Sequence, residues 1–100
     1  MRFTWDEKKN RANRRKHGVS FEAATLVFRD PSILFEQDRD VEGEPRWQAI
    51  GRVTETLLLL VAHVYEYDEE IDEERIRIIS TRKATPREAD AYYAQFYTRG

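Results

Sequence analysis

The stretch LLLLVAHV, residues 57–64, is a nearly continuous apolar segment in a chain that is otherwise rich in charge. Its length suits one strand, and apolar residues on both sides of a strand predict a central strand that is covered on both faces. Polar or glycine-containing separators divide the surrounding sequence into further runs with strand character. We therefore expect an antiparallel meander of strands over residues 33–38, 46–53, 56–67 and 75–82.

A polar helix is predicted over residues 6–17. Thr4 or Asp6 can cap its first turn, and Gly18 can end it. Ala12 is its only clearly apolar residue. A helix this polar cannot be held by a wide apolar stripe, so we expect it to lie on the surface and present its side chains.

Two further helices follow from capping signals. Ser20 begins an amphipathic pattern that stops at residues 30–31, Asp-Pro. TPRE, residues 85–88, combines a capping threonine, a proline at the first helical position and a glutamate at the third. Residues 2–5 are interpreted as a short strand or an extended lead-in. The order predicts an α+β fold in which N-terminal helices and a C-terminal helix pack on a small antiparallel sheet.

The composition is that of one globular domain over residues 1–100, with 40% hydrophobic and 36% charged residues. The absence of cysteine excludes disulfides, thiolate zinc sites and cysteine nucleophiles, and two histidines argue against a histidine-rich metal centre. The N-terminus MRFTWDEKKN lacks the apolar core of a signal peptide. We expect a cytoplasmic protein with no membrane association.

The net charge of −2 conceals a segregation of charge along the chain. Residues 1–29 carry +5, residues 30–74 carry −11 and residues 75–100 carry +4. If the two basic ends meet in space, they form one cationic surface that suits a polyanion. The alternative is that scattered charges only keep the protein soluble.

Six lysines and arginines, Lys9 among them, crowd nine positions of the predicted first helix. They repel one another, so an anionic partner would relieve a cost, although such runs also occur as solvated faces. Asn10, Asn13 and His17 form a row along the same helix that could contact RNA or a substrate hydroxyl. The alternative for His17 is a simple cation at the C-terminus of the helix.

Two predicted strands carry several arginines each: Arg46 and Arg52 on the second, and Arg75, Arg77 and Arg82 on the last. Strict alternation places Ser80 and Arg82 on one face of the last strand and Arg75 and Arg77 on the other. Arginines on adjacent strands could clamp a phosphate, because guanidinium binds phosphate oxygens in bidentate fashion. The alternative is that they pair with acidic residues or face solvent.

Motifs of the common cofactor-dependent enzymes and hydrolases do not occur: there is no P-loop, no dinucleotide-binding glycine motif, no HExxH and no GxSxG. Acid–base and electrostatic chemistry on a phosphodiester remains possible without a cofactor. In such a reaction a ribose 2′-hydroxyl attacks its own phosphorus, which requires RNA. His63 lies inside the apolar stretch, and we expect it to be a partly buried strand histidine with its hydrogen bonds satisfied rather than a catalytic one.

Several stretches resemble the BrnT family of toxins from bacterial type II toxin–antitoxin systems: residues 3–30, GEPRW at 43–47, RIISTRKATPRE at 77–88 and a closing tyrosine pair. The resemblance implies a RelE-like fold and a ribonuclease that arrests growth. It also implies neutralisation by a BrnA-type antitoxin in a 2:2 complex, which reaches operator DNA only through the antitoxin. Thr81 replaces an alanine usual in the family, and the acidic turn at 66–74 is longer than usual.

The resemblance also implies residue roles, with no metal and no cofactor. The expected catalytic residues are Arg77 and Arg82 at the transition-state phosphate and His17 or Glu44 as proton acceptor or donor. Together with the helix row, the expected RNA-binding and phosphate-binding residues are Arg46, Arg52, Lys83, Ser80, Lys9 and Asn13. An alternative, suggested by the net negative charge, is a non-catalytic module that binds an acidic antitoxin segment and acts in operon autoregulation.

Overall fold

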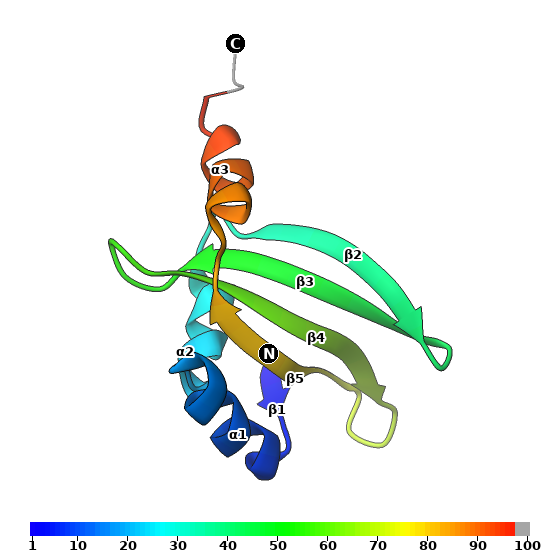
Figure 1. Cartoon of the computed structure of the whole chain (residues 1–100). Coiled ribbons are helices and arrows are strands. Elements are labelled where there is room, and N and C mark those ends of the chain that lie inside the picture. The colour runs from blue at the N-terminus through cyan, green and yellow to red at the C-terminus, as the bar shows by residue number, and fades with distance from the viewer. Residues whose placement is uncertain (98–100) are drawn as a thin grey trace.

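The computed structural model describes residues 1–97, which form a five-stranded mixed sheet and three α-helices (Figure 1). The strands are β1 (Arg2–Thr4), β2 (Leu34–Val41), β3 (Glu44–Arg52), β4 (Leu58–Asp68) and β5 (Glu73–Lys83). The helices are α1 (Glu7–His17), α2 (Phe21–Thr25) and α3 (Pro86–Ala94), and α2 continues into a 3-10 turn, η1 (Leu26–Arg29). The α+β class and the antiparallel meander from β2 to β5 are confirmed. Residues 98–100 of the predicted domain lie outside the described residues.

The sheet has the order β1-β5-β4-β3-β2, and its first strand makes it mixed rather than purely antiparallel. β1 runs parallel to β5, with Phe3 opposite Ile76. A parallel pair needs a long connection, and here the connection is most of the chain. Phe3 gives β1 its place, because its ring packs 5.3 Å from that of Phe28 in η1.

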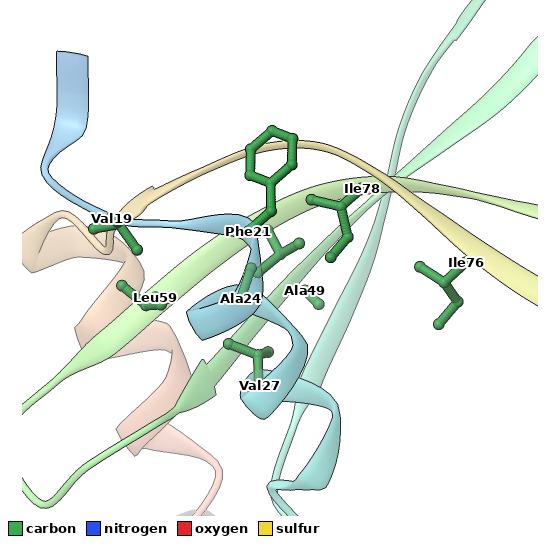
Figure 2. Close-up of a cluster of buried hydrophobic side chains, with 9 residues drawn as sticks. Val19, Phe21, Ala24, Val27, Ala49, Leu59, Ile76 and Ile78 are labelled. Carbon is green, nitrogen blue, oxygen red and sulfur yellow. The ribbon is translucent and has the colours of Figure 1, made fainter. Parts of the chain in front are cut away.

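The central position of β4 explains the apolar stretch that it contains. Leu59 and Val61 are fully buried on the side covered by α2 and η1, where they join the cluster drawn in Figure 2. Leu60 points the other way and packs with Ile50 against Tyr92 of α3. The prediction that this strand is covered on both faces is confirmed only at the end near Leu60, where the N-terminal helices lie on one side of the sheet and α3 on the other.

Gly51 allows η1 to lie directly on β3. A Cβ atom at this position would stand 2.7 Å from the Val27 side chain and 3.0 Å from the Val27 carbonyl oxygen. Sequence patterning predicted one continuous helix from Ser20 to residue 30, whereas the helical hydrogen bonds tighten to 3-10 geometry from Leu26 onward. The tightened turn carries Val27 into the core.

Helix α1 is held by two buried asparagines instead of an apolar stripe. Asn10 accepts a hydrogen bond from the Phe21 backbone at 2.8 Å and donates one to Glu22, also at 2.8 Å, which lowers the pKa of Glu22. Asn13 spans to β5: its amide donates to the Thr81 carbonyl at 2.8 Å and its oxygen accepts from the Thr81 N–H at 3.1 Å. The amide thus pairs with the edge of β5 beyond the point where β1 ends.

The helix ends follow their capping signals. Asp6 caps α1 by accepting from the Lys8 N–H at 2.8 Å, so the second of the two predicted caps is the one used. Gly18 ends α1 with a φ of 72°. At α3 the full capping box of Thr85 and Glu88 is present, as predicted. No helix within residues 1–97 is long and apolar enough to cross a membrane.

Candidate active site on the open face of the sheet

A β-bulge in β5 decides which side chains share a face. The register between β4 and β5 shifts by one residue at Ile79, which has no partner of its own. The extra residue moves the alternation by one position. Arg75 and Arg77 therefore point to the same side as Ser80 and Arg82, and the prediction that strict alternation separates them is wrong.

These side chains share what we call the open face, the side of the sheet opposite α1 and α2. The β3 side chains at Glu44, Arg46 and Gln48 alternate onto the same face, while α3 covers only the end near Leu60. Arg46 directly precedes Trp47, whose partner across the sheet is His63. It therefore lies next to Val64, the partner of Arg77 on the adjoining strand.

A carboxylate–arginine cluster, made of Glu44, Glu66, Arg75 and Arg77, occupies the middle of this face. The Nη2 atom of Arg77 is 2.8 Å from a Glu44 carboxylate oxygen, and its Nε is 3.5 Å from Glu66. Arg75 reaches Glu66 at 3.5 Å from the other side. One-third of the Arg77 side chain remains exposed, so its guanidinium is accessible from solvent.

Arg46 differs from the other arginines beside the cluster because it makes no ion pair within residues 1–97. Its Nε is buried and has no hydrogen-bond partner. A buried N–H without a partner costs free energy.

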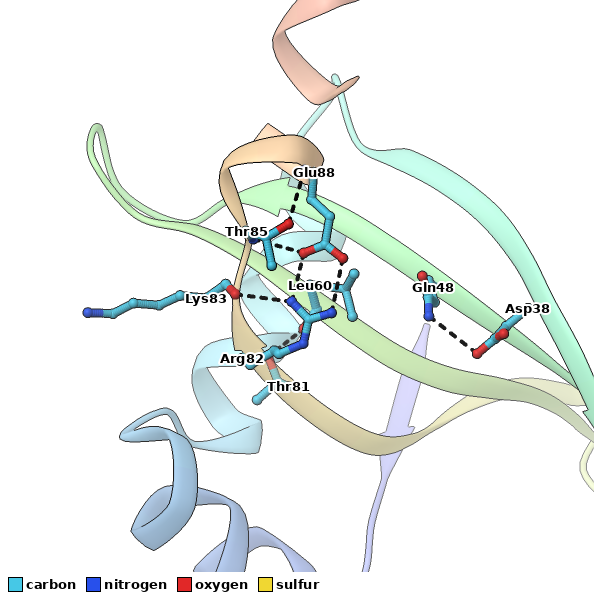
Figure 3. A network of polar contacts seen from close by, with 8 residues as sticks. All are labelled: Asp38, Gln48, Leu60, Thr81, Arg82, Lys83, Thr85 and Glu88. Atoms are coloured by element: carbon cyan, nitrogen blue, oxygen red, sulfur yellow. Dashed lines mark hydrogen bonds and ion pairs between the residues drawn. The ribbon is translucent and has the colours of Figure 1, made fainter. Parts of the chain in front are cut away.

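Arg82 lies on the open face near α3 and is bound by Glu88 (Figure 3). Two hydrogen bonds of 2.7 and 3.0 Å join the guanidinium to the carboxylate. The pairing raises the pKa of Arg82 and lowers the pKa of Glu88, in both cases mainly through the hydrogen bonds. Glu88 also accepts from the Thr85 N–H at 2.9 Å, so one carboxylate caps α3 and fixes Arg82.

A separate cationic surface lies on the other side of the sheet. Lys83 alternates away from Arg82 and lines a groove with Arg14, Gly18 and Ser20. The six lysines and arginines of α1 are exposed, and none makes an ion pair within the described part of the chain. We call α1 together with Lys83 the α1 surface. The basic ends of the chain meet here only in part, because Arg75, Arg77 and Arg82 lie on the open face.

A family model described as the ribonuclease toxin BrnT of type II toxin–antitoxin systems matches residues 5–88. This chain belongs to the BrnT family. It is thus a member of a family of ribonuclease toxins, and a type II toxin has an antitoxin partner.

The BrnT fold is also seen in a solved structure that resembles this chain. The crystal structure of the Brucella abortus ribonuclease toxin BrnT matches with 24% identity and a TM-score of 0.59, covering 85% of this chain and 97% of that one. A likeness at this identity supports the shared fold. No match is found among curated proteins.

The fold of this BrnT member brings together some of the residues predicted for the site and separates others. The open face holds Arg77, Glu44, Arg46, Ser80 and Arg82. Arg52 follows at the far end of β3, where it is exposed. The residues on α1, namely Lys9 and His17, are not part of this face, and Lys83 points to the α1 surface.

Asn13 is the predicted RNA-binding residue that the structure argues against. It is 7% exposed, and its amide nitrogen donates to the carbonyls of both Val19 and Thr81. Its oxygen accepts from the Thr81 backbone. Because every polar atom of this side chain is used within the fold, we leave Asn13 out of the RNA-binding set.

Two carboxylates of the site were missed by sequence reasoning. Glu66 falls within the predicted strand over residues 56–67 but was also counted in the acidic turn over residues 66–74, and it was not named as a site residue; the structure places it in β4, which continues to Asp68. Glu88 was explained as a helix cap alone.

His63 is a strand histidine on the helix side of the sheet, as expected, but it is fully buried rather than partly buried, and its Nε2 has no hydrogen-bond partner. The rings of Phe28 and Tyr65 lie 5.0 and 5.2 Å from the imidazole, and burial lowers its pKa. A neutral histidine packed among aromatic rings has a structural role. Within residues 1–97, no group of three or more histidine, aspartate or glutamate side chains is arranged to hold a metal ion.

Proposed function

We propose that this chain is a metal-independent endoribonuclease that cuts RNA on the open face of its sheet. The observation that carries the proposal is the contact between Arg77 and Glu44 at 2.8 Å, with Arg46 unpaired beside it. A carboxylate and guanidinium groups are the parts needed for general base catalysis and for stabilising a phosphorane. Membership of a ribonuclease toxin family supports the same reaction.

In the proposed reaction Glu44 accepts the proton of a ribose 2′-hydroxyl. The 2′-oxygen then bonds to the adjacent phosphorus and the bond from phosphorus to the 5′-oxygen breaks, with water donating a proton to the leaving oxygen. The products are a 2′,3′-cyclic phosphate and a 5′-hydroxyl. Arg77 exchanges part of its contact with Glu44 for a phosphate oxygen and stabilises the negative charge of the transition state.

Flanking phosphates are bound by the other cations of the open face. Arg46 supplies a guanidinium that forms no ion pair within residues 1–97, Arg82 supplies a guanidinium that Glu88 holds in place, and Ser80 offers a hydroxyl between Arg77 and Arg82. Arg52 extends this row to the end of β3. Because the arginines stand on rigid strands, the phosphates they bind are held in a fixed geometry.

The body of a longer RNA lies along the α1 surface. This second contact area includes Lys9, His17 and Lys83, which bind RNA away from the phosphate that is cut. Cations that lack protein partners release counterions when RNA binds, so this contact adds affinity that falls with salt. The acidic remainder of the chain lowers non-specific binding elsewhere.

The biological setting follows the family. We propose a single RelE-like toxin domain over residues 1–100 that acts in the cytoplasm, arrests growth by cutting RNA and is neutralised by a BrnA-type antitoxin. The complex is a 2:2 assembly, and operator DNA is contacted only through the antitoxin. Support comes from the family match over residues 5–88.

A cleavage assay in EDTA tests the proposal. Wild-type protein freed of antitoxin should cut RNA without added metal, and Glu44→Gln and Arg77→Ala should each lower the rate by roughly 10- to 1000-fold. Glu42→Gln and Arg39→Ala are matched controls, since both side chains are exposed on the β2 to β3 hairpin. Cleavage that requires Mg²⁺, or normal rates in both site variants, would reject the mechanism.

A second candidate function is the non-catalytic antitoxin-binding module. It is favoured by the observation that Arg75, Arg77 and Arg82 are all bound by carboxylates in the free protein. Under this reading the wild-type rate equals that of Arg77→Ala, and expression without the antitoxin leaves growth normal. Growth arrest that disappears in the Glu44→Gln variant favours the nuclease.

A further inference from the structure

An exposed aromatic patch lies on the helix side of the sheet, beyond the reach of α1 and α2. It consists of Phe35, Trp47, Tyr65 and Tyr67, and Figure 1 shows β2 to β5 extending past the helices in this region. Phe35, Tyr65 and Tyr67 are 45%, 37% and 57% exposed. Contiguous apolar side chains left open on a small protein mark a surface for a partner.

The patch is rigid because its residues stand on paired strands around a buried centre. His63 lies beneath it, 5.2 Å from the ring of Tyr65 and 6.2 Å from that of Phe35. Trp47 packs edge-on against Tyr65 at 6.1 Å. Rings that are already ordered lose little conformational entropy when a partner covers them, so such a surface favours tight binding.

Acidic side chains surround the patch on the two hairpins that border it. They are Asp40 at the end of β2 and Glu42 in the turn that follows it, Glu69, Glu70 and Asp72 in the turn between β4 and β5, and Glu74 at the start of β5. All six are exposed, and none forms an ion pair within residues 1–97. Glu74 stands opposite Tyr67, so negative charge reaches the edge of the aromatic rings.

This combination of chemistry selects among possible occupants. RNA could stack on the rings, but its phosphates would meet six carboxylates at close range. A second copy of the chain would bring an identical acidic rim against the first, which like-charge repulsion disfavours. A segment with apolar side chains flanked by lysines or arginines satisfies both the rings and the rim.

We propose that the aromatic patch binds the antitoxin through a cationic, apolar segment of that partner. The proposal rests on the antitoxin that membership of a type II toxin family implies, and it does not depend on the nuclease mechanism. The antitoxin-binding surface then lies on the opposite side of the sheet from the carboxylate–arginine cluster. The same patch therefore serves for binding whether or not the open face cuts RNA.

Titration calorimetry with the full-length antitoxin encoded beside this chain tests the proposal. Tyr67→Ser and Glu74→Lys should each raise the Kd at least tenfold, because one removes an exposed ring and the other reverses a rim charge. The matched controls Tyr97→Ser and Glu55→Lys change an exposed tyrosine and an exposed glutamate outside the patch and should leave the Kd unchanged. Circular dichroism establishes that each variant is folded.

Salt adds a second readout. The wild-type Kd should rise with ionic strength, and Glu74→Lys should flatten that dependence, as expected for an ionic rim. The proposal is overturned if both patch variants bind normally, or if only Arg77→Ala and Arg82→Ala weaken binding, which would place an acidic segment on the open face. A dimer of the toxin alone that Tyr67→Ser dissociates would assign the patch to a second copy.

Discussion

Arg82 and Glu88 are joined through two hydrogen bonds, 2.7 and 3.0 Å long, across the junction between β5 and α3. The same carboxylate completes the capping box with Thr85. A helix cap and the position of an arginine on the open face thus depend on one side chain. If Arg82 binds RNA as proposed, stability and RNA binding are coupled at Glu88.

Replacing Glu88 by Gln should lower the free energy of unfolding by about 1–2 kcal/mol at neutral pH, because a charge-assisted contact and part of the cap are lost. The folded-state pKa of Glu88 lies below its usual 4.5, so this stabilisation is complete above pH 4.5 and disappears as the pH falls further. Urea unfolding of both proteins from pH 3 to 8 measures it. A constant difference across that range would contradict the assignment.

Asn13→Ala should cost about 2–3 kcal/mol, since it leaves the N–H and C=O groups of Thr81 without partners at a buried position. Thermal unfolding measures the loss. Arg15→Ala, an exposed change on the same helix, should stay within about 0.5 kcal/mol of wild type. An equal, small effect of the two changes would mean that α1 is held by other contacts.

Tyr92→Phe removes the hydrogen bond from the tyrosine hydroxyl to Asp30, which is 2.6 Å long. Burial and this bond raise the pKa of Tyr92 to about 12. A raised folded-state pKa contributes stability below pH 10 that is lost as the pH rises toward 12. Wild type should exceed the variant by about 1–2 kcal/mol at pH 8.

Between pH 10 and 12 the stability of wild type relative to Tyr92→Phe should fall by on the order of 2–3 kcal/mol, so that the variant becomes the more stable protein near pH 12. Urea midpoints of wild type and Tyr92→Phe at pH 8, 10 and 11 follow the difference. Tyr97→Phe, an exposed change, serves as the control. Parallel curves for wild type and Tyr92→Phe would show that Tyr92 does not titrate in this way.

Gly51→Ala should destabilise the fold by about 1–3 kcal/mol, because the new methyl group would stand 2.7 Å from the Val27 side chain. The double variant Gly51→Ala/Val27→Ala should be less destabilised than the sum of the two single losses, because the clash with the Val27 side chain is removed. The relief should be partial, since the Val27 carbonyl oxygen also lies 3.0 Å from the new methyl group. A double-mutant cycle by chemical denaturation gives the coupling. Full additivity would show that η1 moves freely off β3.

Most elements of the fold could be predicted because local signals and tertiary contacts agree. The capping box at Thr85 and Glu88 and the apolar run around Leu59 specify a helix start and a central strand by short-range chemistry. The parallel pairing of β1 could not be read in this way, since it joins residues more than seventy positions apart along the chain. β1 has only three residues, with one apolar side chain at Phe3, and this is too short a pattern to distinguish a strand from an extended lead-in.

The sequence indicated which types of residue form the candidate site, but not which arginine pairs with which carboxylate. Arginines on the later strands were identified, but their carboxylate partners come from distant positions, as with Arg77 and Glu44. A polar row on α1 was interpreted as an RNA contact, whereas Asn10 and Asn13 prove to hold the helix in place. Buried amides and solvent-facing amides look the same in a sequence, because only tertiary structure distinguishes them.

The unpaired residue Ile79 also affects how relatives of this toxin should be compared. A relative without the bulge has one residue fewer in this strand, so an alignment that introduces no gap there assigns its arginines to the wrong side of the sheet. Deletion of the single codon for Ile79 would remove the bulge and bring Ile78 next to Ser80, opposite His63 and Ala62, so Arg75 and Arg77 would stay on the open face. The same deletion at another position of β5 would leave the bulge in place and change which side chains face it, so the position of the extra residue matters as much as the residues that the strand carries.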